Sequence, residues 1–272
     1  MTHRLLSIGH GYSGRATENA LGPGWQVLGT SRRAGAGTVL WPDGAAEALL
    51  RATHLISWVP PGYDGDPVLP ILRDLPAPAL RWIGYASASS VYGDSGGALV
   101  DESAPDAPAT ERGHKRLRAE TAWQAFADRH AVPLARLRIA GIYGPGRSVL
   151  DALRAGRAQR VVKPGQVFNR IHVADLGRIV AAAARQRLDG PLILSDDEPA
   201  PQADVIAHAA ALMGLPIPPT VDFDSASLSP MARSFYAENK RLRSARMGPD
   251  LGLALLYPDF RAGLSAILAA GG

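Results

Sequence analysis

The stretch SIGHGYSG, residues 7–14, has the spacing G-x-G-x-x-G and lies between a short apolar run and a helical pattern. In such a strand–turn–helix unit the first glycine permits the tight turn and the second lets a pyrophosphate approach the backbone. The third allows the helix to pack closely on the strand, and the phosphates lie at the positive end of the helix. The pattern predicts a dinucleotide site; the alternative is a glycine-rich turn without a ligand. The residues assigned to this site are Gly9, Gly11, Tyr12, Ser13 and Gly14.

The rest of the chain supports this interpretation, because short apolar runs alternate with helical patterns up to residue 194. This alternation is typical of βαβ units around a parallel sheet. The expected strands cover residues 5–8, 25–30, 54–59, 81–86, 134–142 and 191–194. The expected helices cover residues 15–21, 45–52, 67–75, 111–129 and 173–187.

The sequence therefore predicts an α/β fold, a Rossmann-type doubly wound parallel sheet with a small C-terminal lobe. Residues 1–194 would form the dinucleotide-binding domain, including parts of the substrate cleft. Residues 195–272, with a Pro-rich turn at 215–219 and a mostly helical tail, would form the lobe on the substrate side.

Composition excludes several classes of protein. The chain has 272 residues, 46% of them apolar and 20% charged, which excludes disorder and allows a sizeable core. Its apolar runs are shorter than the roughly 18 residues of a membrane span, and its start lacks a signal-peptide pattern, so we expect a cytoplasmic protein. With no cysteine, disulfides and thiolate chemistry are excluded. The acidic triplet 196–198 is interpreted as a turn before a helix, and no metal is expected.

The charge pattern points to small anionic ligands. The net charge is +4, and of 29 basic residues three are lysines, which leaves 26 arginines. A nucleic-acid-binding protein should gather its positive charge on one face, whereas these arginines are spread along the chain among acidic residues. We therefore expect no nucleic-acid partner.

The end of the second predicted strand indicates which dinucleotide is bound. Ser31, Arg32 and Arg33 follow it, and the next carboxylate is Asp43. A site for NAD places an acidic residue here on the ribose 2′-hydroxyl, whereas arginine accommodates a 2′-phosphate. Bonds between guanidinium and phosphate are charge-assisted and often bidentate. NADP(H) is thus predicted over NAD(H), the alternative being a solvated arginine pair.

Four further segments carry a family resemblance: SWVPPGYDGDPVL (57–69), YASASSVYGDSGG (85–97), RIAGIYGPGRS (138–148) and NRIHVADLGRIV (169–180). With the glycine loop they resemble the extended short-chain dehydrogenase/reductase superfamily, in particular the NAD-dependent epimerase/dehydratase group. The run SPMARSFYAENKRLRSARM looks like that of atypical bacterial members. The resemblance implies a C-terminal lobe that closes over the substrate and a homodimer. It assigns cofactor contacts to Pro60, Ser87, Tyr143 and Gly144, and contacts with an anionic substrate to Arg147 and Arg170.

The family's catalytic pattern is absent. Its members use Tyr-x-x-x-Lys with a Ser or Thr, and aligning Ala-Glu of that helix places Arg112 and Arg116 at the tyrosine and lysine positions. The hydroxyl position is Ala88. Arginine stays protonated and cannot act as a general base. The candidate substitutes are Ser89, Tyr92 and Lys115, although Tyr92 could be structural and Lys115 points about 100° away from residue 116.

Two functions follow from these observations. The first is an NADP(H)-dependent oxidoreductase or epimerase-like enzyme acting on a small carbonyl, hydroxyl or sugar-nucleotide substrate with a rearranged catalytic set. The second is a catalytically silent NADP(H)-binding sensor or regulatory protein. Both predict cofactor binding, and they differ in turnover.

Overall fold

The computed structural model describes residues 3–33 and 38–271 and has a seven-stranded parallel sheet at its centre. The order of the strands reverses between β1 and β4, which makes the carboxyl ends of these two strands the topological switch point. The predicted doubly wound α/β fold is confirmed. In sheet order the strands are β11 (Gly190–Leu194), β7 (Leu134–Ile139), β5 (Trp82–Ala88), β4 (His54–Ser57), β1 (His3–Ile8), β2 (Trp25–Ser31) and β3 (Thr38–Leu40).

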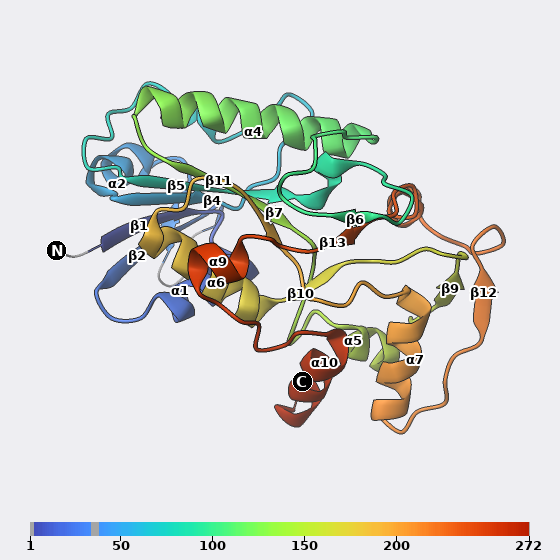
Figure 1. The fold of residues 1–272 in the computed structure, drawn as a ribbon. Coiled ribbons are helices and arrows are strands. Elements are labelled where there is room, and N and C mark those ends of the chain that lie inside the picture. The colour runs from blue at the N-terminus through green and yellow to red at the C-terminus, as the bar shows by residue number, and fades with distance from the viewer. Residues whose placement is uncertain (1–2, 34–37, 272) are drawn as a thin grey trace.

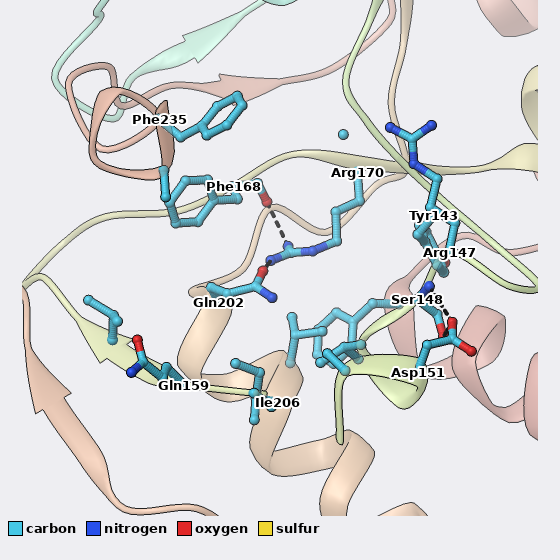
Figure 2. A pocket seen from close by; sticks show the side chains of 18 of the residues that line it. Tyr143, Arg147, Ser148, Asp151, Gln159, Phe168, Arg170, Gln202, Ile206 and Phe235 are labelled. Atoms are coloured by element: carbon cyan, nitrogen blue, oxygen red, sulfur yellow. Dashed lines mark hydrogen bonds between the residues drawn. The ribbon is translucent and has the colours of Figure 1, made fainter. Parts of the chain in front are cut away.

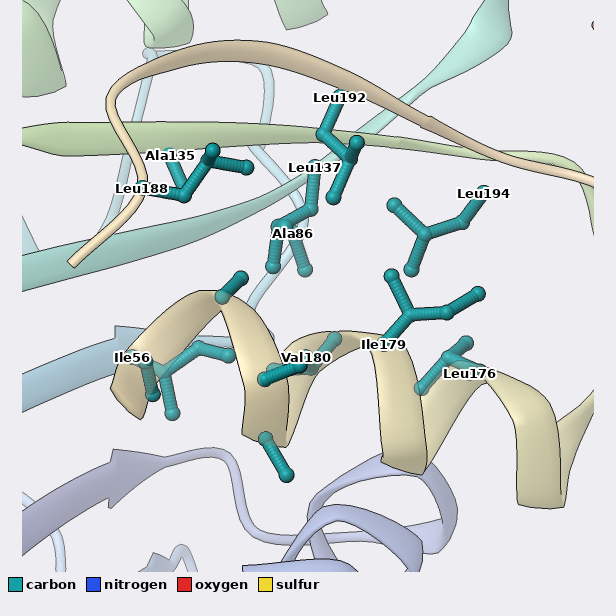
Figure 3. Close-up of a cluster of buried hydrophobic side chains, with 14 of the residues drawn as sticks. Ile56, Ala86, Ala135, Leu137, Leu176, Ile179, Val180, Leu188, Leu192 and Leu194 are labelled. Atoms are coloured by element: carbon teal, nitrogen blue, oxygen red, sulfur yellow. The ribbon is translucent and has the colours of Figure 1, made fainter. Parts of the chain in front are cut away.

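Helices cover both faces of the sheet, because successive strand residues point to opposite sides. Leu5 joins a core cluster with Leu137 and Ile179, whereas Leu6 joins another that contains Trp123. Figure 3 shows the first cluster, with Ile179 and Val180 facing the strands. The first face carries α1 (Tyr12–Leu21), α6 (Val173–Gln186) and α9 (Met247–Leu251). The second face carries α2 (Ala45–Arg51), α3 (Leu69–Leu72) and α4 (Glu111–Arg129). Figure 1 shows α4 on the opposite side of the sheet from α1 and α6.

Several segments after residue 143 build a second group of elements beside the sheet (Figure 1). Here α5, α7 and α10 share an apolar cluster, and β9 pairs with β12. This group thus includes α5 and β9, which precede residue 195, while β13 and α9 return to β6 and α6. The second group contains α5 (Val149–Arg154), β9 (Arg160–Val162), α7 (Gln202–Leu212), β12 (Thr220–Asp222), α8 (Pro230–Ser234) and α10 (Phe260–Ala269). The two short strands outside it are β6 (Leu99–Val100) and β13 (Arg241–Leu242).

Within the central sheet the structure differs from the sequence prediction at two places. It adds β3, a three-residue strand beside β2. It also divides the strand predicted at 134–142 into β7 and β8 (Gly141–Tyr143), because the chain changes hydrogen-bonding partners at this point. The Ala140 N–H still donates to Leu194 O (3.0 Å), whereas the Gly141 N–H donates to Asn169 O (3.0 Å), and β8 pairs with β10 (Arg170–His172).

Helix boundaries agree best where a cap is present. The hydroxyl of Thr110 accepts from the Gly113 N–H (3.2 Å), and α4 covers the predicted residues 111–129. By contrast α1 begins at Tyr12, three residues before the prediction, and α3 has four residues where nine were predicted. A short 3₁₀ helix, η1 (Ser89–Tyr92), follows β5. Among the described residues, no helix combines the length and the apolar character required to cross a bilayer.

Candidate functional site

The glycine loop lies at the switch point, between the ends of β1 and β4. Gly9 has φ +73°, a conformation that favours glycine, and a Cβ there would come within 2.9 Å of Val59 Cγ2. At Gly14 a Cβ would come within 2.8 Å of the His10 ring, which bonds to Ser7 Oγ (2.9 Å) and Glu18 (3.0 Å). The loop is therefore held tightly between two strands and the first helix.

The first turn of α1 leaves backbone donors free. No acidic side chain occupies it, and the cap residue, Gly11, supplies no side-chain hydrogen bond. The N–H groups of Tyr12, Ser13 and Gly14 have no acceptor within the described part of the chain. Free N–H groups at the positive end of a helix suit a phosphate, so these residues fit the diphosphate of a dinucleotide.

Two arginines follow β2 at the same edge of the sheet. Arg32 and Arg33 are both exposed, and the ion pairs among residues 3–33 and 38–271 include neither of them. Ser31 Oγ accepts from the Arg33 N–H at 3.3 Å. These two guanidinium groups are free to bind an anion beside the glycine loop.

The loop after β8 approaches the glycine loop directly. Tyr12 donates its hydroxyl to Pro145 O (3.1 Å), and a Cβ at Gly144 would overlap that hydroxyl. Burial raises the pKa of Tyr12, while the positive charge of Arg147 opposes this shift. The predicted site residues Tyr12, Gly144 and Arg147 are thereby brought together from two distant segments.

The other predicted cofactor contacts are placed differently. Pro60 is exposed just after β4. Ser87 is buried in β5, and its hydroxyl donates to Glu120 at 2.5 Å. Tyr143 is also buried, its hydroxyl 3.4 Å from Asp259 O. The Ser87 hydroxyl is thus engaged by the protein itself, as part of a buried network in which Glu120 also accepts from Arg138 (2.7 Å).

The family's catalytic positions meet at a cavity of about 330 Å³, at the carboxyl ends of β5 and β7. Ala88 lines it, and so do Arg112 and Arg116. Arg116 donates to Tyr85 Oη (3.1 Å) and Ala86 O (2.8 Å), while the Arg112 guanidinium lies 4.3 Å from the centre of the Phe235 ring. The cavity is consequently cationic where the family carries its tyrosine and lysine.

Only one of the three predicted catalytic residues, Ser89, is among those that line this cavity. Tyr92 is 4% exposed, and burial raises its pKa despite the Arg138 guanidinium 4.6 Å from its ring. Lys115 lies on another face of α4, with Nζ 4.7 Å from the centre of the Tyr63 ring and 3.8 Å from a carboxylate oxygen of Glu111. The assignment of these three residues to catalysis stays a prediction.

Lys240 is a cavity residue that the sequence analysis did not single out. It is 5% exposed, and its Nζ donates to Gly93 O and to Glu238 (2.7 Å). It reaches this place through the pairing of β13 with β6. The one signal available in the sequence was its rarity, as one of three lysines among 29 basic residues.

A larger cavity of about 770 Å³ adjoins the first and shares with it Gly141, Phe168, Asn169 and Phe235. Figure 2 shows the two arginines predicted to bind substrate among its lining residues. Arg147 is exposed, whereas Arg170 is 7% exposed and donates to Phe168 O (2.8 Å), Ala200 O (3.1 Å) and Gln202 (2.8 Å). Most of the other lining side chains are apolar, among them Val149, Val205, Ile206, Leu228, Met231 and Leu264.

The acidic triplet after β11 does not converge on one point. Asp196 is 1% exposed, Asp197 is exposed, and Glu198 pairs with Arg261. Burial raises the pKa of Asp196 to about 8, although the positive charge of Arg170 opposes this. Within the described residues no group of three or more His, Asp or Glu side chains could hold a metal ion.

The fold and the loop at its switch point define a class: the protein has the fold of the extended short-chain dehydrogenase/reductase enzymes, as its sequence motifs led us to expect. Human epimerase family protein SDR39U1, solved with NADPH, superposes with a TM-score of 0.79 at 18% identity, over 98% of this chain and 99% of that one. MoeE5, solved with UDP-glucose and NAD, superposes with a TM-score of 0.79 at 21% identity, over 98% and 97%. No model of a known protein family matches the chain.

A more similar structure defines the family. A conserved protein of unknown function from Silicibacter pomeroyi DSS is 46% identical over 99% of both chains, with a TM-score of 0.90. This chain belongs to the same family. A 3-diazoavenalumate denitrifying reductase from a Streptomyces species is 33% identical over 144 residues. The match covers 47% of this chain and 45% of the reductase, so less than half of that relative is matched.

Proposed function

We propose that the protein is an NADP(H)-dependent oxidoreductase of the atypical short-chain dehydrogenase/reductase type. The observation that carries the proposal is the glycine loop at the switch point, with three free N–H groups in the first turn of α1. Support comes from similar folds solved with NADPH and with NAD. When bound, the cofactor supplies or accepts a hydride, while the protein binds and orients the reactants.

The preference for NADP(H) rests on Arg32 and Arg33. Both guanidinium groups are exposed at the end of β2 and take no part in an ion pair among the described residues. A 2′-phosphate would give them charge-assisted hydrogen bonds, which together contribute about 1.5–3 kcal/mol at these exposed positions. NADH, which lacks this phosphate, would gain nothing from them.

Calorimetric titration of the variant R32A/R33A tests this preference. The variant should bind NADPH about 10- to 100-fold more weakly and NADH with about unchanged affinity. Arg51→Ala, at the end of α2 just before β4 begins, is the matched control and should change neither affinity. An equal loss for both cofactors would overturn the 2′-phosphate assignment.

The chemistry would take place in the 330 Å³ cavity. β5 lies two positions from β1 in the sheet, about 10 Å from the glycine loop at the same edge. Ser89 lines this cavity, so we assign its hydroxyl to hydrogen bonding with the reacting oxygen. Tyr92 and Lys115 do not line this cavity, and their catalytic role stays a prediction from the sequence. The cytoplasmic location stays a prediction as well.

A silent NADP(H)-binding protein is the second candidate, and one observation favours it: the positions of the general acid and its lysine hold Arg112 and Arg116. Turnover separates the two functions. An enzyme should oxidise NADPH with at least one member of a panel of carbonyl compounds, and the absorbance of NADPH reports it. Tight NADPH binding without turnover across the panel would favour the silent protein.

A further inference from the structure

The 330 Å³ cavity holds more positive than negative charge. Arg112, Arg116 and Lys240 line it together with a single carboxylate, that of Glu238. This carboxylate already accepts from Lys240 Nζ (2.7 Å) and from the Thr110 hydroxyl (3.0 Å). It forms its ion pair with the lysine, so that three cationic side chains share one carboxylate in this cavity.

Neither arginine forms an ion pair among the described residues. Arg112 lies against the ring of Phe235, and burial lowers its pKa, although the negative charge of Glu238 opposes this shift. Arg116 donates only to neutral oxygens, and its buried Nε has no acceptor. A buried donor without an acceptor is costly, and an anionic ligand supplies both the missing acceptor and the missing charge.

The adjoining cavity has a mixed lining. Phe168 and Phe235 line both cavities, and the larger cavity combines apolar side chains such as Ile206 and Leu264 with polar ones at other points of its lining. Arg170 is one of these, but its Nη atoms are already bonded to two carbonyls and Gln202. The apolar side chains of this cavity would suit an aryl or alkyl group.

We propose that the substrate is an amphipathic carboxylate, with its carboxylate held between Arg112 and Arg116 and its apolar body in the larger cavity. This inference rests on the proposed oxidoreductase function and narrows its substrate class. A reactive carbonyl adjacent to the carboxylate would lie beside Ser89, which lines the same small cavity.

Two ketones that differ only in the anionic group test the proposal. Phenylpyruvate carries a carboxylate where phenylacetone carries a methyl group, and both are titrated calorimetrically into protein saturated with NADP⁺. We expect phenylpyruvate to bind about 10- to 100-fold more tightly. Arg112→Gln should remove this advantage, and Arg112→Lys should restore part of it. Arg118→Gln, on the exposed side of the same helix and paired with Glu111, is the matched control and should keep the advantage.

Three results would overturn the proposal: equal binding of the two ketones, no binding of phenylpyruvate, or tighter binding of UDP-glucose or phenyl phosphate than of phenylpyruvate. NADPH binding is measured separately on each variant, which also reports whether the variant is folded. If wild-type protein binds no dinucleotide, the proposed function fails, and the two ketones are then compared on the cofactor-free protein. An Arg112-dependent preference there would keep the carboxylate site, and its absence would refute it.

Discussion

Asp196 makes the stability of the protein dependent on pH in an unusual direction. Its side chain is 1% exposed just after the end of β11 and forms no ion pair within the described residues. Burial raises its pKa to about 8, and the opposing charge of Arg170 does not cancel this effect. The substitution Asp196→Asn replaces the titrating group by a neutral one of nearly the same shape.

The magnitude follows from proton linkage. An aspartate in the unfolded chain titrates near pH ~4, so between about pH 4 and pH 8 the folded protein keeps a proton that the unfolded chain has lost. The stability contributed by Asp196 is therefore complete below pH ~4 and is lost as the pH rises towards 8, by up to about 1.4 kcal/mol per pH unit. Between pH 5 and pH 7 this amounts to about 3 kcal/mol.

Urea unfolding at pH 5 and pH 7 measures this effect. Relative to wild type, the free energy of unfolding of Asp196→Asn should increase by about 3 kcal/mol from pH 5 to pH 7. Asp197→Asn changes the neighbouring exposed aspartate and should follow the wild type at both pH values. If the difference between Asp196→Asn and wild type were the same at pH 5 and pH 7, the carboxyl would have to titrate as in the unfolded chain, and the reasoning would be refuted.

Two further predictions concern the buried ion pair and the glycine loop. Glu120→Ala should lower the free energy of unfolding in urea by about 3 kcal/mol, because it leaves the buried Arg138 with only the partly exposed carboxylate of Asp106. Glu111→Ala changes an exposed residue of the same helix and should cost less than about 1 kcal/mol, and equal losses for the two variants would contradict this. Gly9→Ala and Gly22→Ala both place a Cβ at positive φ, which should lower the free energy of unfolding by about 1 kcal/mol each. Only the Cβ at residue 9 also clashes with Val59, so only Gly9→Ala should weaken NADPH binding, by about tenfold or more in calorimetry. Equal effects of the two variants on NADPH binding would exclude the glycine loop from the cofactor site.

The features that could be predicted from the sequence depend on residues close together in the chain. The glycine loop needs three glycines within six residues, a strand before them and a helix after them, all visible in residues 5–21. The boundaries of α4 follow from a threonine cap and an apolar pattern within one segment. The parallel sheet follows from the repeated alternation of strands and helices, because only crossover connections join parallel neighbours.

Other features depend on contacts between distant segments. Residues 134–142 form one apolar run, yet the chain changes partners at Gly141 because Asn169, 28 residues further on, offers the next acceptor. Lys240 reaches the small cavity because two-residue strands pair across more than 140 residues. The sequence predicts only that Asp196 belongs to a turn before a helix, whereas in the folded chain its side chain is 1% exposed.

In the candidate site, too, some features could be predicted from the sequence and others depend on contacts between distant segments. Residue identity at the family's catalytic positions was enough to show that Arg112 and Arg116 replace the tyrosine and lysine. It did not show that Lys240 pairs with Glu238 while the two arginines form no ion pair within the described residues, or that Arg170 donates to backbone carbonyls. Charge balance and polarity in a cavity are sums over side chains that meet only when the chain folds. Local motifs therefore determine the sheet and its cofactor loop, whereas packing between distant segments sets the chemistry of the substrate cavity.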